Sequence, residues 1–373
     1  MIITKPPMGW STRDVSRDNV CDSLIRETAD IMVSVGLRDA GYEYVAVDDC
    51  FSLRERDTDG RIVPDPEKFP FGMKSLADYV HSKGLKLGIS CCADNCEGGY
   101  AGYHKAFLDA ETFAGWGVDY LKYDFCNIPT PDDRRIAYTR IKTALQATGR
   151  DMVFSACSAG RPEDEIWARS AGADLYRCGE CVTETTPSDA EIVRAENETI
   201  RYSAPGCFND TDTHAFGKDG DEGALDPDLF GDVEFKSRFA LRCLNSQPLM
   251  ISSDLRGIRP EILDLLKNPG LIRIDQDEEC RPPMYASIKG DICPTFFKHL
   301  SDHQFAVGFF NLSDGNGSAD FRTWDIGLTI NAGFGMMLRE VFTGETMGPI
   351  NDFVSLELAP HDCRVFIGEW VDM

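Results

Sequence analysis

Two hydrophobic periods alternate along about the first 280 residues of this chain. Short apolar runs, of the kind that form buried parallel strands, are separated by stretches whose apolar residues recur at helical spacing. In residues 75–86, for example, a helical pattern stops at Gly84 and a strand-like run follows. The pattern predicts strands at residues 8–12, 42–50, 85–92, 120–126, 152–158, 175–180, 207–210 and 248–254. It predicts helices at residues 23–37, 73–82, 103–116, 133–148, 162–170, 188–202, 232–245 and 260–266.

Strand and helix units repeated in this order predict an α/β fold, a (β/α)₈ TIM barrel. The active site of such a barrel lies at the C-terminal ends of its strands. Polar residues gather at those ends in the predicted strands, namely Asp48, Asp49, Cys91, Cys92, Asp124, Ser158, Glu180, Asn209 and Asp210. We therefore expect the functional site at this end of the barrel.

The pattern changes after the barrel to short alternating segments separated by turn residues. Residues 305–311 and 364–367 are strand-like, and the sequence Asp314-Gly315-Asn316-Gly317 marks a turn. These features predict a small C-terminal antiparallel β-sandwich. We place the barrel at residues 1–281 and the sandwich at residues 282–373, and expect the two domains to pack directly against each other.

Composition excludes several classes of protein. Charged residues make up 27% of the chain and hydrophobic residues 42%, which is typical of a globular protein. The net charge of −24 and the lack of a basic cluster argue against a nucleic acid partner. The sequence shows neither a signal peptide nor a run of about 18 apolar residues, so we expect no membrane partner and a cytoplasmic location, unless a leader was removed.

Metal and cofactor sites are not indicated by the cysteines. The chain has 14 of them, scattered rather than arranged as a disulfide framework. The pair Cys178 and Cys181 has CxxC spacing, but no second CxxC or ligand-spaced histidine pair accompanies it. We expect neither a metal nor an organic cofactor.

The predicted strand at residues 120–126 contains two charged residues of opposite sign. Side chains alternate along a strand, so Lys122 and Asp124 face the same way. An adjacent ammonium group favours the ionised carboxylate that a nucleophile needs. The alternative is an internal ion pair with a structural role, which perturbs a carboxylate in the same way.

Several ordered motifs carry a resemblance to a known family. They are Pro6-Pro7-Met8-Gly9-Trp10, Tyr44-Val45-Ala46-Val47-Asp48-Asp49-Cys50, Tyr120-Leu121-Lys122-Tyr123-Asp124, Asn209-Asp210-Thr211-Asp212 and Pro248-Leu249-Met250-Ile251-Ser252-Ser253-Asp254. With them the chain resembles the family 27 glycoside hydrolases, the α-galactosidases and α-N-acetylgalactosaminidases. The resemblance implies a retaining hydrolase without cofactor, whose partner is a carbohydrate substrate.

The resemblance also assigns roles to residues of the predicted site. It implies that Asp124 is the nucleophile of a double displacement and that Lys122 contacts the sugar. Asp48 and Asp49 would accept hydrogen bonds from sugar hydroxyls, although capping of the following loop is an alternative role for both. Trp10 belongs to the first motif and is assigned to the substrate-binding residues.

The acid/base is the point where the sequence departs from the family pattern. In the family an arginine is followed four residues later by the aspartic acid with this role, whereas Arg177 is followed at that distance by Cys181. Glu180 stands one position earlier and is one methylene longer, so we assign it as acid/base with Arg177 as a substrate contact. The alternative is that Glu180 is a surface loop residue, and Glu184 is the next carboxylate along the chain.

The identity of the sugar is left open by four positions. Ser158 stands where α-galactosidases have a glutamate and resembles the N-acetylgalactosaminidases, but Arg161 breaks that match. Arg13 and Ser90 replace aromatic pocket residues, and the two arginines are either solvated or read an anionic substituent. We expect release of terminal α-D-galactose, with N-acetylgalactosamine and β-L-arabinopyranose as alternatives.

A second class of function also remains open. The displaced acid/base and the missing aromatic residues are compatible with a catalytically impaired sugar-binding homologue. The sequence of the predicted sandwich shows no aromatic strip of the kind found in carbohydrate-binding modules, so we expect that domain to be structural. The sequence does not indicate an oligomeric state.

Overall fold

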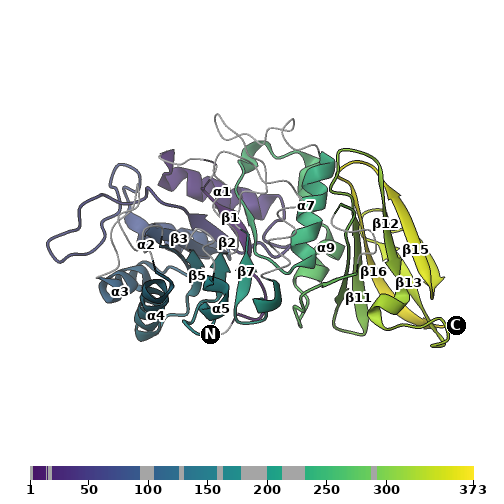
Figure 1. Cartoon of the computed structure of the whole chain (residues 1–373). Coiled ribbons are helices and arrows are strands. Elements are labelled where there is room, and N and C mark those ends of the chain that lie inside the picture. The colour runs from purple at the N-terminus through teal and green to yellow at the C-terminus, as the bar shows by residue number, and fades with distance from the viewer. Residues whose placement is uncertain are drawn as a thin grey trace.

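The computed structural model describes residues 3–13, 15, 19–92, 105–125, 130–157, 163–177, 200–211, 232–286 and 292–373. Two bodies lie side by side, an α/β barrel and an antiparallel β-domain, with helices α7 (Asp232–Leu244) and α9 (Pro269–Asp275) between them (Figure 1). The predicted fold class, a (β/α)₈ barrel followed by a β-sandwich, is confirmed. The boundary between residues 281 and 282 stays a prediction.

The barrel is a curled sheet of eight parallel strands in the order β7-β6-β5-β4-β3-β2-β1-β8 within the described residues. The strands are β1 (Met8–Ser11), β2 (Tyr44–Val47), β3 (Lys86–Cys92), β4 (Tyr120–Asp124), β5 (Val153–Cys157), β6 (Leu175–Arg177), β7 (Phe208–Asp210) and β8 (Leu249–Ile251). All of them coincide with predicted strands. Their order follows the chain, as expected when each strand is joined to the next by a right-handed helical crossover.

Helices cover the outside of the sheet. The further helices are α1 (Asp22–Ser34), α2 (Gly72–Ser82), α3 (Ala106–Trp116), α4 (Pro131–Ala147), α5 (Asp164–Trp167) and α8 (Pro260–Leu266). Short 3₁₀ turns are formed by η2 (Ile200–Tyr202) and η4 (Leu255–Gly257). Most of the helix predicted at residues 188–202 lies outside the described residues, and its end forms η2.

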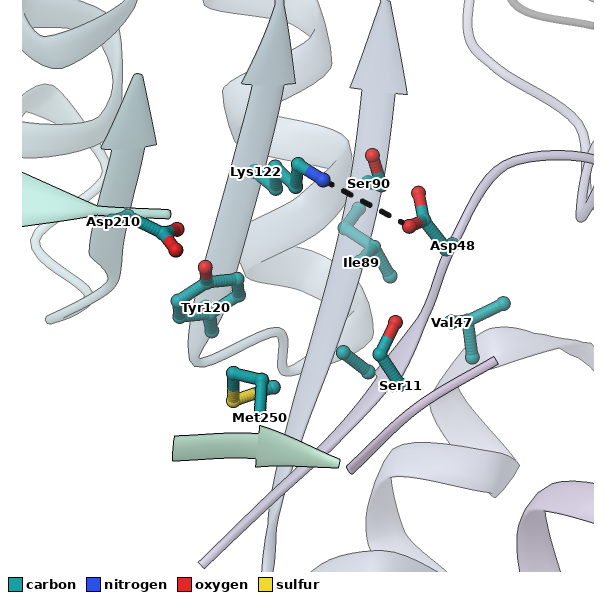
Figure 2. Close-up of a pocket in the computed structure, with 10 residues that line it drawn as sticks. Ser11, Val47, Asp48, Ile89, Ser90, Tyr120, Lys122, Asp210 and Met250 are labelled. Atoms are coloured by element: carbon teal, nitrogen blue, oxygen red, sulfur yellow. Dashed lines mark ion pairs between the residues drawn. The ribbon is translucent and has the colours of Figure 1, made fainter. Parts of the chain in front are cut away.

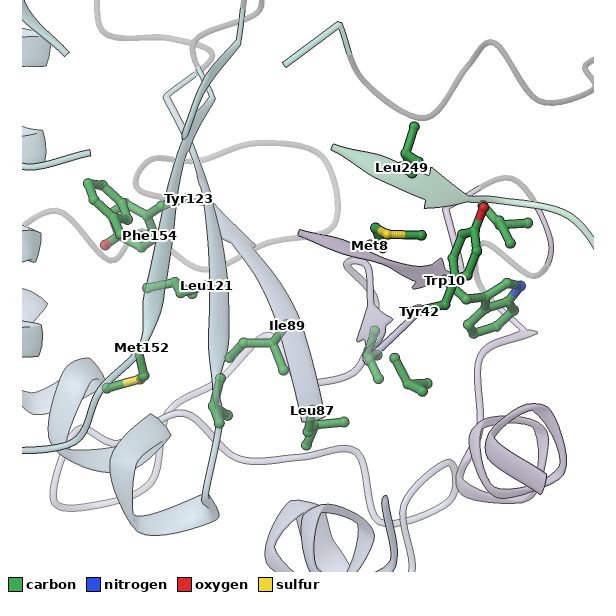
Figure 3. Packing of buried hydrophobic residues seen from close by; sticks show 14 of the residues in the cluster. Met8, Trp10, Tyr42, Leu87, Ile89, Leu121, Tyr123, Met152, Phe154 and Leu249 are labelled. Carbon is green, nitrogen blue, oxygen red and sulfur yellow. The ribbon is translucent and has the colours of Figure 1, made fainter. Parts of the chain in front are cut away.

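Alternation along the strands divides the barrel core into two parts. Val45, Leu87 and Leu121 point outward and pack with the helices, in the cluster of which Figure 3 shows a part. Tyr44 and Tyr120, one position before, point inward with a separate apolar cluster. The apolar inner cluster fills the lower barrel, so polar inward side chains are concentrated toward the C-terminal ends of the strands.

The C-terminal domain consists of two antiparallel sheets. The larger has the order β14-β13-β16-β11-β10-β9 and the smaller pairs β12 with β15. The strands are β9 (Met284–Tyr285), β10 (Thr295–His299), β11 (Gln304–Phe310), β12 (Gly317–Arg322), β13 (Phe334–Glu340), β14 (Thr346–Ile350), β15 (Phe353–Leu358) and β16 (Cys363–Asp372), with the 3₁₀ turn η5 (Thr323–Ile326) after β12. Phe297 of β10 and Phe321 of β12 stack with ring centroids 6.2 Å apart, so the sheets face each other across an apolar core.

The larger sheet is covered on both faces. One face packs on the smaller sheet, and the other adds Ala306, Phe310 and Val365 to the cluster that includes the barrel helices. Because the apolar cluster is continuous from barrel to sandwich, the two bodies form one packed molecule.

Candidate active site

Polar side chains from five strands of the barrel, or from the residue just after a strand, line one pocket. The lining residues are Ser11, Ala46, Val47, Asp48, Ile89, Ser90, Tyr120, Lys122, Asp210 and Met250. The pocket holds about 370 Å³ of space that atoms do not fill, and part of this space is open to solvent. Figure 2 shows Lys122, Asp48, Ser90 and Asp210 around it. The opening to solvent gives access to these polar side chains.

Lys122 connects two walls of this pocket. Its ammonium nitrogen Nζ lies 4.0 Å from Oδ2 of Asp48, and both side chains are nearly buried. Burial, the largest influence, lowers the pKa of Lys122, but the negative charges around it, first that of Asp48, outweigh burial and raise the pKa above its ordinary value. Lys122 is therefore a fixed positive charge in the wall of the pocket at physiological pH.

Asp124 lies two residues after Lys122 on the same strand and is 9% exposed. The Ser90 hydroxyl donates a long hydrogen bond of 3.4 Å to its Oδ2 atom. Cys157 is its register partner on β5, and the Phe125 N–H donates to the Cys157 carbonyl oxygen at 2.8 Å. The main chain on both sides of Asp124 is thus fixed by strand pairing, which holds the carboxylate on a rigid element.

Asp49 follows β2 in an unusual backbone conformation. Its φ angle is +34°, and Cys50 has a φ angle of +52°. Non-glycine residues with positive φ are uncommon, and two in succession store strain that the surrounding structure must hold. Upstream, the Asp48 N–H donates to the Thr12 hydroxyl oxygen at 2.7 Å, which ties this turn to the end of β1.

Electrostatics set the protonation of Asp49. Burial, followed by the charges of Asp48 and Asp124, raises its pKa to about 7. Lys122 and Arg13 act in the opposite direction and are not strong enough to cancel this increase. Near neutral pH, Asp49 therefore carries a proton part of the time and can donate a hydrogen bond, whereas an ionised carboxylate can only accept one.

A second acidic and basic pair lies on the neighbouring strands. Arg177 of β6 is 4% exposed and is the register partner of Asp210 on β7. Asp210 lines the pocket and points toward Tyr120 and Lys122 in Figure 2. In the sequence, Asp210 is one of the polar residues at the predicted strand ends, but the pattern does not indicate a role for it. Its position at an inward-facing strand end was the available signal.

The structure does not bring all predicted residues into the pocket. Trp10 has no exposed surface, packs in the outer apolar cluster and donates its Nε1–H to the Ser253 carbonyl oxygen at 2.7 Å. Alternation along β1 explains this, because Ser11 faces the pocket and Trp10 faces away. Its burial does not favour a substrate contact, which stays a prediction. Ser158 and Glu180 lie outside the described residues.

No group of three or more histidine, cysteine, aspartate or glutamate side chains is arranged to hold a metal ion within the ranges that the structure describes. Among the described residues, the pocket offers the carboxylates of Asp48 and Asp210, the hydroxyls of Ser11, Ser90 and Tyr120, and the ammonium group of Lys122. A buried carboxylate on a rigid strand beside a fixed positive charge is suited to nucleophilic catalysis.

The comparison with known families decides the classification. The family model described as alpha galactosidase A matches residues 6–277. The model described as the alpha galactosidase C-terminal beta sandwich domain matches residues 291–367. The chain is a member of the family 27 glycoside hydrolases. It is accordingly an enzyme of the glycoside hydrolase class.

Relatives of this glycoside hydrolase match along most of its length. It is 33% identical to the α-galactosidase of Cyamopsis tetragonoloba over 97% of this chain and 85% of that protein. It is 36% identical to the α-N-acetylgalactosaminidase of Rattus norvegicus over 83% of this chain and 77% of that protein. The crystal structure of α-galactosidase I from Mortierella vinacea superposes with a TM-score of 0.88 at 25% identity, over 98% of this chain and 97% of that chain.

None of the helices in the described ranges is both long and apolar enough to cross a bilayer.

Proposed function

We propose that this protein is a retaining exo-glycosidase that releases terminal α-D-galactose, with Asp124 as nucleophile and Glu180 as acid/base. The observation that carries the proposal is the Asp124 carboxylate, held on β4 two residues after Lys122 and accepting a hydrogen bond from Ser90, where both Lys122 and Ser90 line the pocket. A retaining glycosidase needs such a carboxylate, positioned rigidly enough to attack one face of the sugar.

The proposed reaction has two displacements. In the first, an Asp124 oxygen forms a bond to the anomeric carbon while the bond to the leaving oxygen breaks, and Glu180 donates its proton to that oxygen. In the second, Glu180 takes a proton from water, the water oxygen attacks the anomeric carbon, and the ester bond to Asp124 breaks. The two inversions give net retention.

Recognition of the sugar is assigned to Asp48, Asp49 and Lys122. The ammonium of Lys122 donates hydrogen bonds, Asp48 accepts them, and partly protonated Asp49 can do either. Such a set suits a neutral sugar with several adjacent hydroxyls. Galactose is favoured because the relative from Cyamopsis tetragonoloba carries the name α-galactosidase and matches over almost the whole chain.

The acid/base assignment is tested by chemical rescue. The Glu180→Ala variant should lose hydrolysis of galactosides with poor leaving groups, because no acid remains to protonate them. Added azide should restore turnover of nitrophenyl α-galactoside and yield galactosyl azide. Undiminished hydrolysis of a natural galactoside such as melibiose by this variant would contradict the assignment.

An α-N-acetylgalactosaminidase activity is the second candidate. It is supported by the 36% identity to the rat enzyme of that name. Nitrophenyl α-galactoside, α-N-acetylgalactosaminide and β-L-arabinopyranoside assayed side by side distinguish the candidates. Fastest release from the α-galactoside is expected, and release from none of them would favour a sugar-binding homologue.

A further inference from the structure

The smaller sheet of the sandwich exposes side chains of β15 on the face that points away from the apolar core, namely Phe353, Ser355 and Glu357. Ala319, Phe321 and Val354 alternate inward and pack in the apolar core. The residues between them therefore point outward. Register pairs on this outer face are Arg322 with Phe353, Asp320 with Ser355, and Ser318 with Glu357.

Two large aromatic residues stand at one end of this face. Phe353 is 49% exposed and Trp324, in η5, is 52% exposed. The Arg322 guanidinium carbon lies 5.2 Å from the centroid of the Trp324 ring, and Arg322 is directly opposite Phe353 across the strand pair. Neighbours opposite each other in a sheet have Cβ atoms about 5 Å apart, so the three side chains form one contiguous surface. We call these residues, with Ser355, the β12–β15 platform.

The turn that carries Trp324 is held firmly. The Thr323 N–H donates to the Asp352 carbonyl oxygen at 2.9 Å, and the Thr323 hydroxyl donates to the Asn351 carbonyl oxygen at 2.9 Å. These bonds join η5 to the turn before β15. A surface fixed in this way loses little conformational entropy when it binds a ligand.

The polar part of the platform is equally ordered. The Ser355 hydroxyl donates to Oδ1 of the buried Asp320 at 2.5 Å, two register positions from the pair of Arg322 and Phe353. The Ser355 hydroxyl and the Arg322 guanidinium are thus on the same face as the aromatic rings. The outer face of an antiparallel sheet is ordinarily polar, so exposed tryptophan and phenylalanine at its end require an explanation.

We propose that the β12–β15 platform binds a neutral carbohydrate chain and holds polymeric substrate near the enzyme. Sugar rings present apolar C–H faces for Trp324 and Phe353 and hydroxyls for Ser355 and Arg322. A polyanion is disfavoured by the acidic groups on the face and by the net charge of −24. A protein partner would need a larger apolar area than two aromatic side chains supply.

The position of the platform separates it from the pocket. Figure 1 shows β12 and β15 on the side of the sandwich away from the barrel. A chain held there is not in contact with Asp124, so platform binding and hydrolysis of a small substrate are independent. The proposal uses membership of a glycoside hydrolase family and does not depend on which terminal sugar is released.

Retardation in a native gel that contains soluble galactomannan tests the proposal. The wild-type protein should be retarded relative to a gel without polysaccharide, and the double variant Trp324→Ala with Phe353→Ala should migrate without retardation. The matched control is Phe107→Ala, which removes a 48% exposed aromatic residue of α3 and should leave retardation unchanged. A repeat with soluble arabinogalactan extends the test to a second neutral polymer.

Kinetics provide the second measurement. In the double variant the KM for galactomannan should rise at least fivefold. The kcat/KM for nitrophenyl α-galactoside should stay within twofold of the wild-type value, and this retained activity also shows that the variant folds. Equal retardation of wild type and double variant, or no wild-type retardation in either polymer, would overturn the proposal. So would a wild-type dimer in size-exclusion chromatography that the double variant loses, because the platform would then be a self-association surface.

Discussion

At the residue scale, the two-residue period of a β-strand explains most of the site. It placed Lys122 and Asp124 on one face from the sequence alone, and the structure has both buried on β4. The same rule applied to β1 would have separated Trp10 from Ser11, since only one of the two can face the pocket. The positive φ of Asp49 has no sequence signal of comparable strength, because it depends on tertiary contacts.

The raised pKa of Asp49 predicts a pH dependence of stability. The native state holds the proton of the Asp49 carboxyl group more tightly than the unfolded chain does. The contribution of Asp49 to the free energy of unfolding is therefore fully present below about pH 4 and is lost as pH rises through about 7. The Asp49→Asn variant cannot titrate. Urea unfolding should show that the free energy of unfolding of the wild type falls between pH 5 and pH 8. In the Asp49→Asn variant this fall should be smaller by on the order of 2 kcal/mol.

A control for this experiment is Asp59→Asn, which changes an exposed carboxyl group. Its pH dependence should match that of the wild type. Identical pH dependence in wild type and Asp49→Asn would contradict the assigned protonation of Asp49.

At the element scale, hydrophobic period predicted each barrel strand because buried parallel strands form continuous apolar runs. Helix α9 was missed because it begins with Pro269 and Gly270, a pair that ordinarily marks a turn. Its start is defined instead by the Asn268 side chain, which accepts hydrogen bonds from the N–H groups of Gly270 and Leu271. Such a short helix is stabilised mainly by packing.

A buried ion pair joins helices α4 and α5. Arg134 of α4 donates to Asp164 of α5 at 2.8 Å, and both side chains are 3% exposed. The Arg134→Ala variant should lose about 3–5 kcal/mol of unfolding free energy, because it leaves a buried carboxylate without its cation. Denaturant titration measures this loss.

The matched control is Arg135→Ala, which removes the exposed ion pair with Asp132. That change should alter stability by less than about 1 kcal/mol. Equal effects of the two variants would mean that burial of the Arg134 pair does not determine its contribution.

At the scale of the whole molecule, one buried lysine links the sandwich to the barrel. Lys298 of β10 has no exposed surface and donates to the Leu244 carbonyl oxygen at 2.9 Å and to Ser246 Oγ at 2.5 Å, at the end of α7. Burial lowers its pKa to about 8, against the opposing effect of Asp275. The ammonium group therefore satisfies the end of a barrel helix from the neighbouring domain.

Replacement of this lysine should destabilise the whole protein. Lys298→Ala leaves buried acceptors at the end of α7 without a donor, so a loss of at least about 3 kcal/mol is expected in urea unfolding. Lys74→Ala, which changes an exposed lysine of α2, should alter stability by no more than about 0.5 kcal/mol. A Lys298→Ala protein as stable as the wild type would show that the link contributes nothing.

The central claim is that Asp124 forms a covalent bond to the sugar, and trapping this intermediate tests it most directly. Incubation with 5-fluoro-α-D-galactosyl fluoride slows breakdown of the glycosyl-enzyme, so that one label per chain should accumulate. Digestion and tandem mass spectrometry should locate the label on Asp124. A label on any other carboxylate, or rapid turnover of unmodified galactosides by an Asp124→Asn variant, would contradict the account.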